Sequence, residues 1–118
     1  MSEQQTQMRF DWVDWQPVTQ PENAGETIDE QFQAFHRANP HIYRILRALA
    51  MDYRRAGHDH CGIKMLYEVL RYQSGIYTRG DAYKLNNNYT SRYARLLMKQ
   101  EPELAGFFET RELAETAE

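Results

Sequence analysis

The sequence contains one cysteine, Cys61, and no apolar run long enough to cross a membrane. A single thiol excludes an intramolecular disulfide, and no apolar leader segment is found near the polar N-terminus. A free cysteine without a leader is typical of a protein kept in a reducing compartment. We therefore expect a cytoplasmic protein with no membrane partner.

The residue patterns of common catalytic chemistry are also missing. There is no Gly-rich phosphate loop, no nucleophile elbow and no motif with paired carboxylates. Between residues 32 and 100 only four acids accompany twelve bases, so a cluster of metal-binding carboxylates like that of a nuclease is not expected. We predict that the chain is not an enzyme and that it uses no cofactor.

A histidine-rich loop is the one place where a metal site has to be considered. His58, His60 and Cys61 fall within four residues, but a structural zinc site usually takes four ligands in two spaced pairs. The other histidines, His36 and His41, do not supply a second pair with such spacing. The spacing favours a loop that holds no metal.

The acids are concentrated at the two ends of the chain and the bases in its middle. Residues 1–31 hold seven acids and one base, and residues 101–118 hold six acids and one base. A basic middle attracts a polyanion such as nucleic acid, and acidic ends would compete for the same surface. The alternative is that the bases form ordinary solvated helix faces and that the ends keep the chain in solution.

The first 26 residues form an acidic arm that contains both tryptophans, Trp12 and Trp15. Two tryptophans in an acidic segment are not expected to stay in water. Docking of this arm on the body of the same chain is favoured over docking on a protein partner. Pro17, Pro21 and Gly25 are typical of a linker to a helical domain at 27–111, which an acidic tail at 112–118 follows.

Periodic apolar residues predict helices at about 27–38, 40–56, 62–73 and 87–100, with a further turn at 102–106. Thr27 and Glu30 have the spacing of a capping box at the start of the first helix. Asn39 is expected to cap the second helix, with Pro40 at its first position. Gly57 follows that helix as a C-terminal cap, and Gly75 is expected to end the third helix.

The remaining segments predict little β structure. Residues 60–62 suit a short extended piece, residues 74–85 suit a small hairpin or an irregular loop, and residues 107–111 suit a short strand or a packed end. The expected fold is therefore mainly α, a small domain of four to five helices with a winged helix-turn-helix-like order. In that order the helix at 62–73 would support the helix at 87–100.

The last long helix has the composition of a DNA-reading helix. Its apolar residues leave arginines and a lysine on the opposite side, and amides and hydroxyls crowd its start, where contacts to base edges and phosphates are made. The candidate contact residues are Asn86, Asn87, Asn88, Thr90, Ser91, Arg92, Arg95 and Lys99, with Arg44, Arg47 and Lys64 extending the basic surface. The alternative is an ordinary capped amphipathic helix, since asparagine is a common cap.

The second half of the chain resembles a family of small bacterial and phage proteins. The segments KLNNNYTSRYARLLM and PELAGFFETR carry the resemblance, which continues weakly into GIKMLYEVLRY at residues 62–72. No catalytic or binding residue is carried over from this family. The resemblance implies a phage, prophage or mobile-element setting, in which small DNA-binding regulators are common.

The sequence leaves three functions open. The first is a DNA-binding regulator of winged-helix type that reads double-stranded DNA with residues 88–100. The second is a small protein-binding inhibitor or adaptor that acts through Trp12, Trp15 and the helical surface. The third is a structural domain that acts as a homodimer, an arrangement also frequent among DNA readers.

Overall fold

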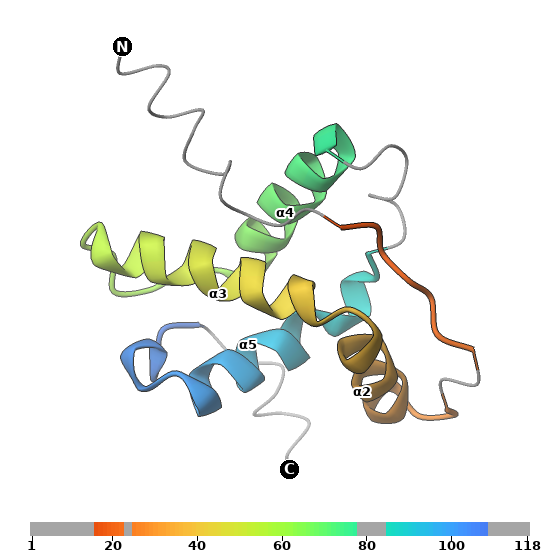
Figure 1. The fold of residues 1–118 in the computed structure, drawn as a ribbon. Coiled ribbons are helices and arrows are strands. Elements are labelled where there is room, and N and C mark those ends of the chain that lie inside the picture. The colour runs from red at the N-terminus through yellow and green to blue at the C-terminus, as the bar shows by residue number, and fades with distance from the viewer. Residues whose placement is uncertain (1–15, 23–24, 78–84, 109–118) are drawn as a thin grey trace.

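Four α-helices and two short 3₁₀ helices make up most of the chain that the computed structural model describes, which is residues 16–22, 25–77 and 85–108. The helices are α2 (Ile28–Ala38), α3 (Pro40–Arg55), α4 (Ile63–Tyr77) and α5 (Thr90–Gln100), and the 3₁₀ helices are η2 (Asn87–Tyr89) and η3 (Pro102–Leu104). The prediction of a mainly α fold is confirmed (Figure 1).

Local signals set the start of α2. The backbone N–H of Glu30 donates to the Thr27 hydroxyl at 3.1 Å, and the Thr27 N–H donates to the Glu30 carboxylate at 3.1 Å. The hydrogen bonds that the Glu30 carboxylate accepts from the backbone N–H groups of Thr27 and Glu26 lower its pKa. The predicted capping box is thus confirmed, and it satisfies N–H groups that a helix start leaves without intrahelical partners.

Asn39 holds the predicted N-cap position of α3, with Pro40 in the first turn, but only its backbone acts as a cap. Its side chain makes no capping hydrogen bond to α3. Instead the fully buried amide accepts from the Thr19 N–H at 2.7 Å and donates to the carbonyls of Thr19 at 2.8 Å and Phe35 at 3.0 Å. Asn39 therefore ties residues 16–20 to the junction of α2 and α3, because a buried amide takes whichever partners satisfy all its groups.

The segment before α2 is part of the fold, although its prolines and glycine indicated a linker. Val18 is buried in the core, and Thr19 is held by Asn39. The described part of the predicted arm at 1–26 thus packs on the helical domain. Trp12 and Trp15 lie outside the described residues.

The third helix is longer than its sequence indicated, and the prediction that Gly75 ends it is wrong. α4 continues to Tyr77, because the buried stripe of Leu66 and Leu70 extends through Ser74 and gives the helix a further packed turn. Packing of that turn outweighs the cost of about 1 kcal/mol for glycine inside a helix. Most of the segment predicted as a hairpin or loop, residues 78–84, lies outside the described residues.

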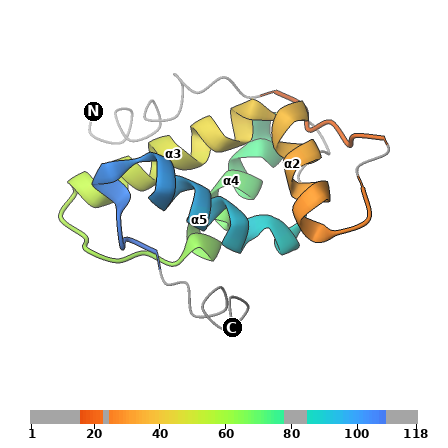
Figure 2. The same ribbon diagram turned by 90° about the horizontal axis from the view of Figure 1, so that it is seen from below.

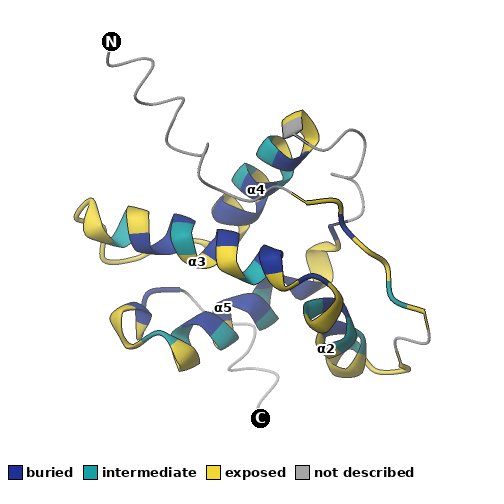
Figure 3. Cartoon of the chain, in the orientation of Figure 1, coloured by how far each residue is buried: buried dark blue, intermediate teal, exposed yellow. Residues whose placement is uncertain are grey.

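α4 packs against both α3 and α5, while α2 crosses one end of α3 (Figures 1 and 2). Aromatic rings join α2 to the start of α5. The ring centres of Phe32 and Tyr93 are 4.8 Å apart in an edge-on arrangement, and those of Phe35 and Tyr89 are 5.1 Å apart. Figure 3 shows how each helix turns its buried side toward this shared core. The core fixes which side of α5 faces solvent.

The end of the described chain returns to the loop before α4. The Cys61 N–H donates to the Phe107 carbonyl at 3.0 Å, and Cys61 forms a parallel bridge with Phe108. Phe107 and Phe108 are buried, and their ring centres are 5.1 Å apart. Residues 107–108 are thus the packed end that the sequence predicted, while residues 109–111 lie outside the described range.

None of the helices in the described part of the chain has the length and apolar character that a bilayer-spanning helix needs.

Candidate nucleic-acid interface

α5 has one narrow solvent side. Tyr93, Ala94 and Leu97 are buried against the core, whereas Arg95 and Lys99 are exposed. Arg92, Arg95 and Lys99 follow one another at helical spacing on this side. We refer to these three bases, together with the exposed Asn88 of η2 just before α5, as the α5 face. The α5 face contains three bases and no acid.

The start of α5 is a self-capped turn. The Asn86 side chain accepts from the Asn88 N–H at 2.8 Å, and its carbonyl accepts from the Tyr67 hydroxyl at 3.0 Å. The Thr90 hydroxyl donates to the Asn87 carbonyl at 3.1 Å. With 7% of its surface exposed, Thr90 belongs to the interior and adds nothing to the exposed surface that the sequence assigned to it. The Asn86 side chain therefore has a structural role at this turn, whatever else it binds.

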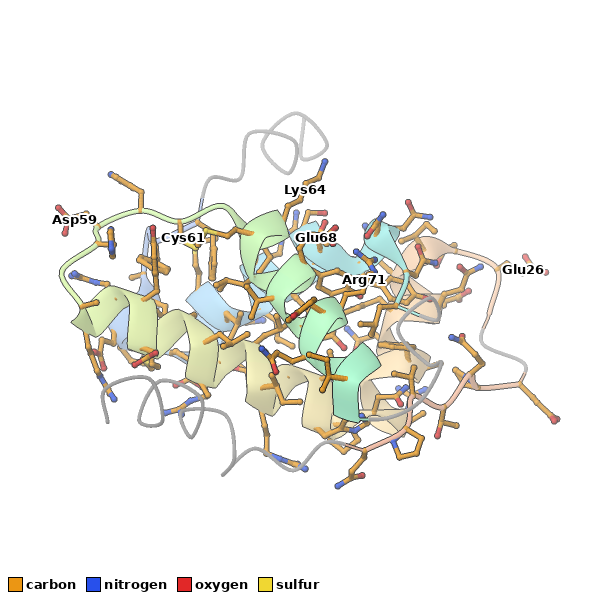
Figure 4. The ribbon with its side chains drawn as sticks, turned by 90° about the horizontal axis from the view of Figure 1, so that it is seen from above. Glu26, Asp59, Cys61, Lys64, Glu68 and Arg71 are labelled. Atoms are coloured by element: carbon orange, nitrogen blue, oxygen red, sulfur yellow. The ribbon has the colours of Figure 1, made fainter. Side chains whose placement is uncertain are left out.

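Arg71 on α4 organises this turn, although the sequence analysis did not single it out. It donates to the Asn87 side-chain oxygen at 2.6 Å and to the Leu85 carbonyl at 3.0 Å. It also pairs with Glu68 at 2.6 Å, and its guanidinium lies 5.6 Å from the centre of the Tyr67 ring. Lys64, Glu68 and Arg71 line one side of α4 in Figure 4. Only the Glu68–Arg71 spacing of three residues was visible in the sequence, and it gives no hint of Asn87.

The first base of the α5 face is already paired. Arg92 Nε lies 2.7 Å from the Asp29 carboxylate of α2, and a quarter of the Arg92 side chain is exposed. Asp29 is itself highly exposed, so the pair is accessible to solvent and to ions. Glu26 and Glu30 join Asp29 around a shallow hollow of about 580 Å³ at this edge. The α5 face thus has an acidic border on the side of α2.

The carboxylates after α5 are neutralised by α3. Glu101 accepts from Arg47 at 3.0 Å and from the Tyr43 hydroxyl at 3.0 Å, and burial together with this carboxylate raises the pKa of Tyr43 to about 12. Glu103 accepts two hydrogen bonds of 2.9 Å from Arg55, which lower its pKa. Acids at this end of the α5 face are therefore compensated.

The remaining predicted bases stand apart on other helices. Arg44 is exposed on α3 and Lys64 on α4, and Ser91 is half-buried on α5. In the part of the chain that the structure describes, no carboxylate lies within ion-pair distance of Arg44, Lys64, Arg95 or Lys99. The two bases without such a partner that share one helix side are Arg95 and Lys99.

The histidine-rich loop has local packing contacts. His58 stacks on Tyr53 with ring centres 3.9 Å apart, and Cys61 is buried. Burial raises the pKa of the Cys61 thiol to about 11, which disfavours the thiolate that a metal would require. Within residues 16–22, 25–77 and 85–108, no group of three or more metal-ligating side chains is close enough to hold an ion.

Comparisons of the chain with protein-family models, with curated proteins and with solved structures gave no match.

Proposed function

We propose that the protein binds double-stranded DNA through the α5 face. The observation that carries the proposal is the charge of Arg95 and Lys99, for which the described residues supply no ion-pair partner, on a helix side that has no acid of its own. Positive side chains of this kind bind phosphates and release counterions. The carboxylates nearest in sequence to the end of the face, Glu101 and Glu103, are paired with α3 and would repel DNA less than free acids.

The geometry of α5 suits the major groove. An α-helix fits this groove, and residues near its first turn reach base edges while bases further along contact phosphates. In this arrangement Asn88 lies in η2 at the start of the α5 face, and Arg95 and Lys99 lie about two and three turns further on. We assign base-edge contact to Asn88 and phosphate contact to the two bases.

The order of elements supports a winged helix-turn-helix reader. The chain follows the connectivity of such a domain, in the order α3, bridged residue Cys61, α4, α5 and bridged residue Phe108. In this domain α4 would be the supporting helix and α5 the reading helix. The connection between α4 and η2, residues 78–86, is longer than the three or four residues of a standard turn. The resemblance of the second half to small bacterial and phage proteins suggests a regulator in a phage or mobile element.

The test is a DNA titration by fluorescence anisotropy at several salt concentrations. The variant is Arg95→Ala/Lys99→Ala, because neither side chain has a described ion-pair partner whose loss would disturb the fold. The control, Arg37→Ala/Arg54→Ala, removes the same charge from α2 and α3. Arg54 pairs with the exposed Asp59 at 3.4 Å, and losing such an exposed pair costs little stability. Loss of two phosphate contacts should reduce the slope of log affinity against log salt by about 1.8 in the variant only. Equal affinities and slopes for both double variants would refute the assignment of the α5 face.

Asp29 gives a variant with the opposite expected sign. Replacing its carboxylate in Asp29→Asn removes the partner of Arg92 and one negative charge at the border of the α5 face. Arg92 then becomes available to phosphate, so DNA affinity should rise and the salt slope should steepen by up to about 0.9. Weaker binding would show that Asp29 positions Arg92 for the complex.

A protein-binding inhibitor or adaptor is the second candidate function. The observation that favours it is the presence of exposed apolar side chains on α4, at Met65, Tyr72 and Ile76. Such patches frequently bind polypeptide. If the titration gives no DNA binding even at low salt, a change of these α4 residues that abolishes capture of a purified protein partner would support this function.

A further inference from the structure

α4 carries a row of exposed apolar side chains on the side away from its core contacts. Among the described residues, every large hydrophobic side chain that is exposed lies on this helix: Met65 is 42% exposed, Tyr72 67% and Ile76 57%. Val69 is half-buried between them. Spacings of four, seven and eleven residues from Met65 put these four side chains in one line, which we refer to as the α4 row.

The α4 row is small in area, and of its four side chains Val69 is the one that packs against the core. The core side of α4 is formed by other residues, including Leu66, Tyr67 and Leu70. The exposed surface of the row is on the order of 350 Å², within the range of functional patches but well below the roughly 800 Å² per partner of a standard interface. This area fits a short peptide segment better than a second folded copy of the chain.

We propose that the α4 row is covered by residues 10–15 of the same chain, FDWVDW, in extended form. The described chain begins at residue 16, and residues 16–22 run past the start of α3 and along α2 (Figures 1 and 2). Val18 is buried and Thr19 is bonded to Asn39 at the start of α3, so residue 15 is only three residues from an anchored position. Attachment this close gives the segment a high effective concentration at α4.

Length and direction agree with this placement. α4 packs on α3 after the turn at 56–62, so its last turns return toward the start of α3, where Thr19 is held. The α4 row spans about 16 Å from Ile76 to Met65, and six extended residues span about 20 Å. Residue 15 would therefore lie by Ile76 and residue 10 by Met65.

Composition and charge agree as well. The segment offers four apolar side chains, Phe10, Trp12, Val13 and Trp15, to a row of four. Asp11 lies at the end of the segment that would reach Met65, whose neighbour Lys64 is exposed and has no carboxylate partner in the described part of the chain. An acidic aromatic segment thus meets an apolar row with a base at its far end.

The tryptophans allow a direct test in the full-length chain, because Trp12 and Trp15 are the only two. We expect blue-shifted tryptophan emission and slow acrylamide quenching in the parent protein. Tyr72→Asp/Ile76→Asp should shift the emission to the red and raise quenching to the value found in denaturant. Each substitution should weaken docking by about tenfold or more, as expected for losing a buried large apolar side chain. The control Gln33→Asp, on the exposed side of α2, should change neither signal.

A second measurement reads the same contact from α4. In a Tyr72→Cys variant, a thiol reagent should modify the new cysteine slowly, and adding Trp12→Ala/Trp15→Ala should accelerate the reaction by about tenfold or more. Cys61 is buried and gives little background. The proposal is overturned if the parent tryptophans are fully exposed, or if they are protected but insensitive to both α4 variants. Protection that depends on protein concentration, with a dimer in sedimentation, would overturn it in favour of a second copy.

Discussion

The strongest test of the fold is the removal of the Asn39 side chain. Asn39 is fully buried, and its amide makes three hydrogen bonds, two to the backbone of Thr19 and one to the Phe35 carbonyl. Asn39→Ala deletes all three hydrogen bonds, and Val18 remains as the buried side chain of the segment at 16–20. The matched control is Asn88→Ala, which removes the same atoms from an exposed asparagine.

The magnitude follows from what each lost partner can do next. A hydrogen bond contributes about 1 kcal/mol net, so three bonds set a scale of about 3 kcal/mol. Thr19 is exposed and can bond water, and the Phe35 carbonyl still accepts from the Asn39 N–H at 2.9 Å. We therefore expect a loss of roughly 2–3 kcal/mol, or a fall in Tm of roughly 8–20 °C.

Urea denaturation followed by circular dichroism measures this loss. A double-mutant cycle with Val18→Ala adds a second readout, because both side chains hold the same segment and their effects should not add. If Asn39→Ala costs no more than Asn88→Ala, or if its effect adds fully to that of Val18→Ala, the assigned role of Asn39 is incorrect.

Three further predictions follow from single side chains. Burial lowers the pKa of His36 below 6.5, so the stability that the neutral ring contributes above that pH should be lost as pH falls through the lowered pKa. The urea midpoint should therefore drop between pH 7 and pH 5, and it should drop less in His36→Phe. The pKa of about 11 at Cys61 predicts slow modification by a thiol reagent at pH 8 until urea unfolds the chain, and fast modification in the folded state would contradict its burial. Thr27→Ala should cost about 1 kcal/mol by removing the side-chain cap of α2, and an equal loss in a Glu30→Gln background would show that the capping box is not cooperative.

Much of the helical structure was readable from the sequence because its signals are local. The capping box of Thr27 and Glu30 acts across three residues, and the Pro40 start of α3 depends only on adjacent backbone geometry. The solvent side of α5 was also predicted, since Arg95 and Lys99 fall opposite Tyr93 and Leu97 at helical spacing. The apolar periodicity of each helical segment therefore predicted the mainly α fold, and that of α5 predicted the exposed bases of the candidate site.

Tertiary structure alone decided which polar side chains are paired within the protein. Arg92 pairs with Asp29, which is 63 residues away in the sequence, and Arg71 bonds Asn87, which is 16 residues away. No local sequence pattern could therefore predict either pair. Gly75 stays helical because packing around it outweighs its propensity. The Asn39 side chain does not cap α3, because the backbone groups of Thr19 and Phe35 offer it three hydrogen bonds. Local sequence sets helix ends and faces, but long-range packing determines which polar groups remain available to a partner.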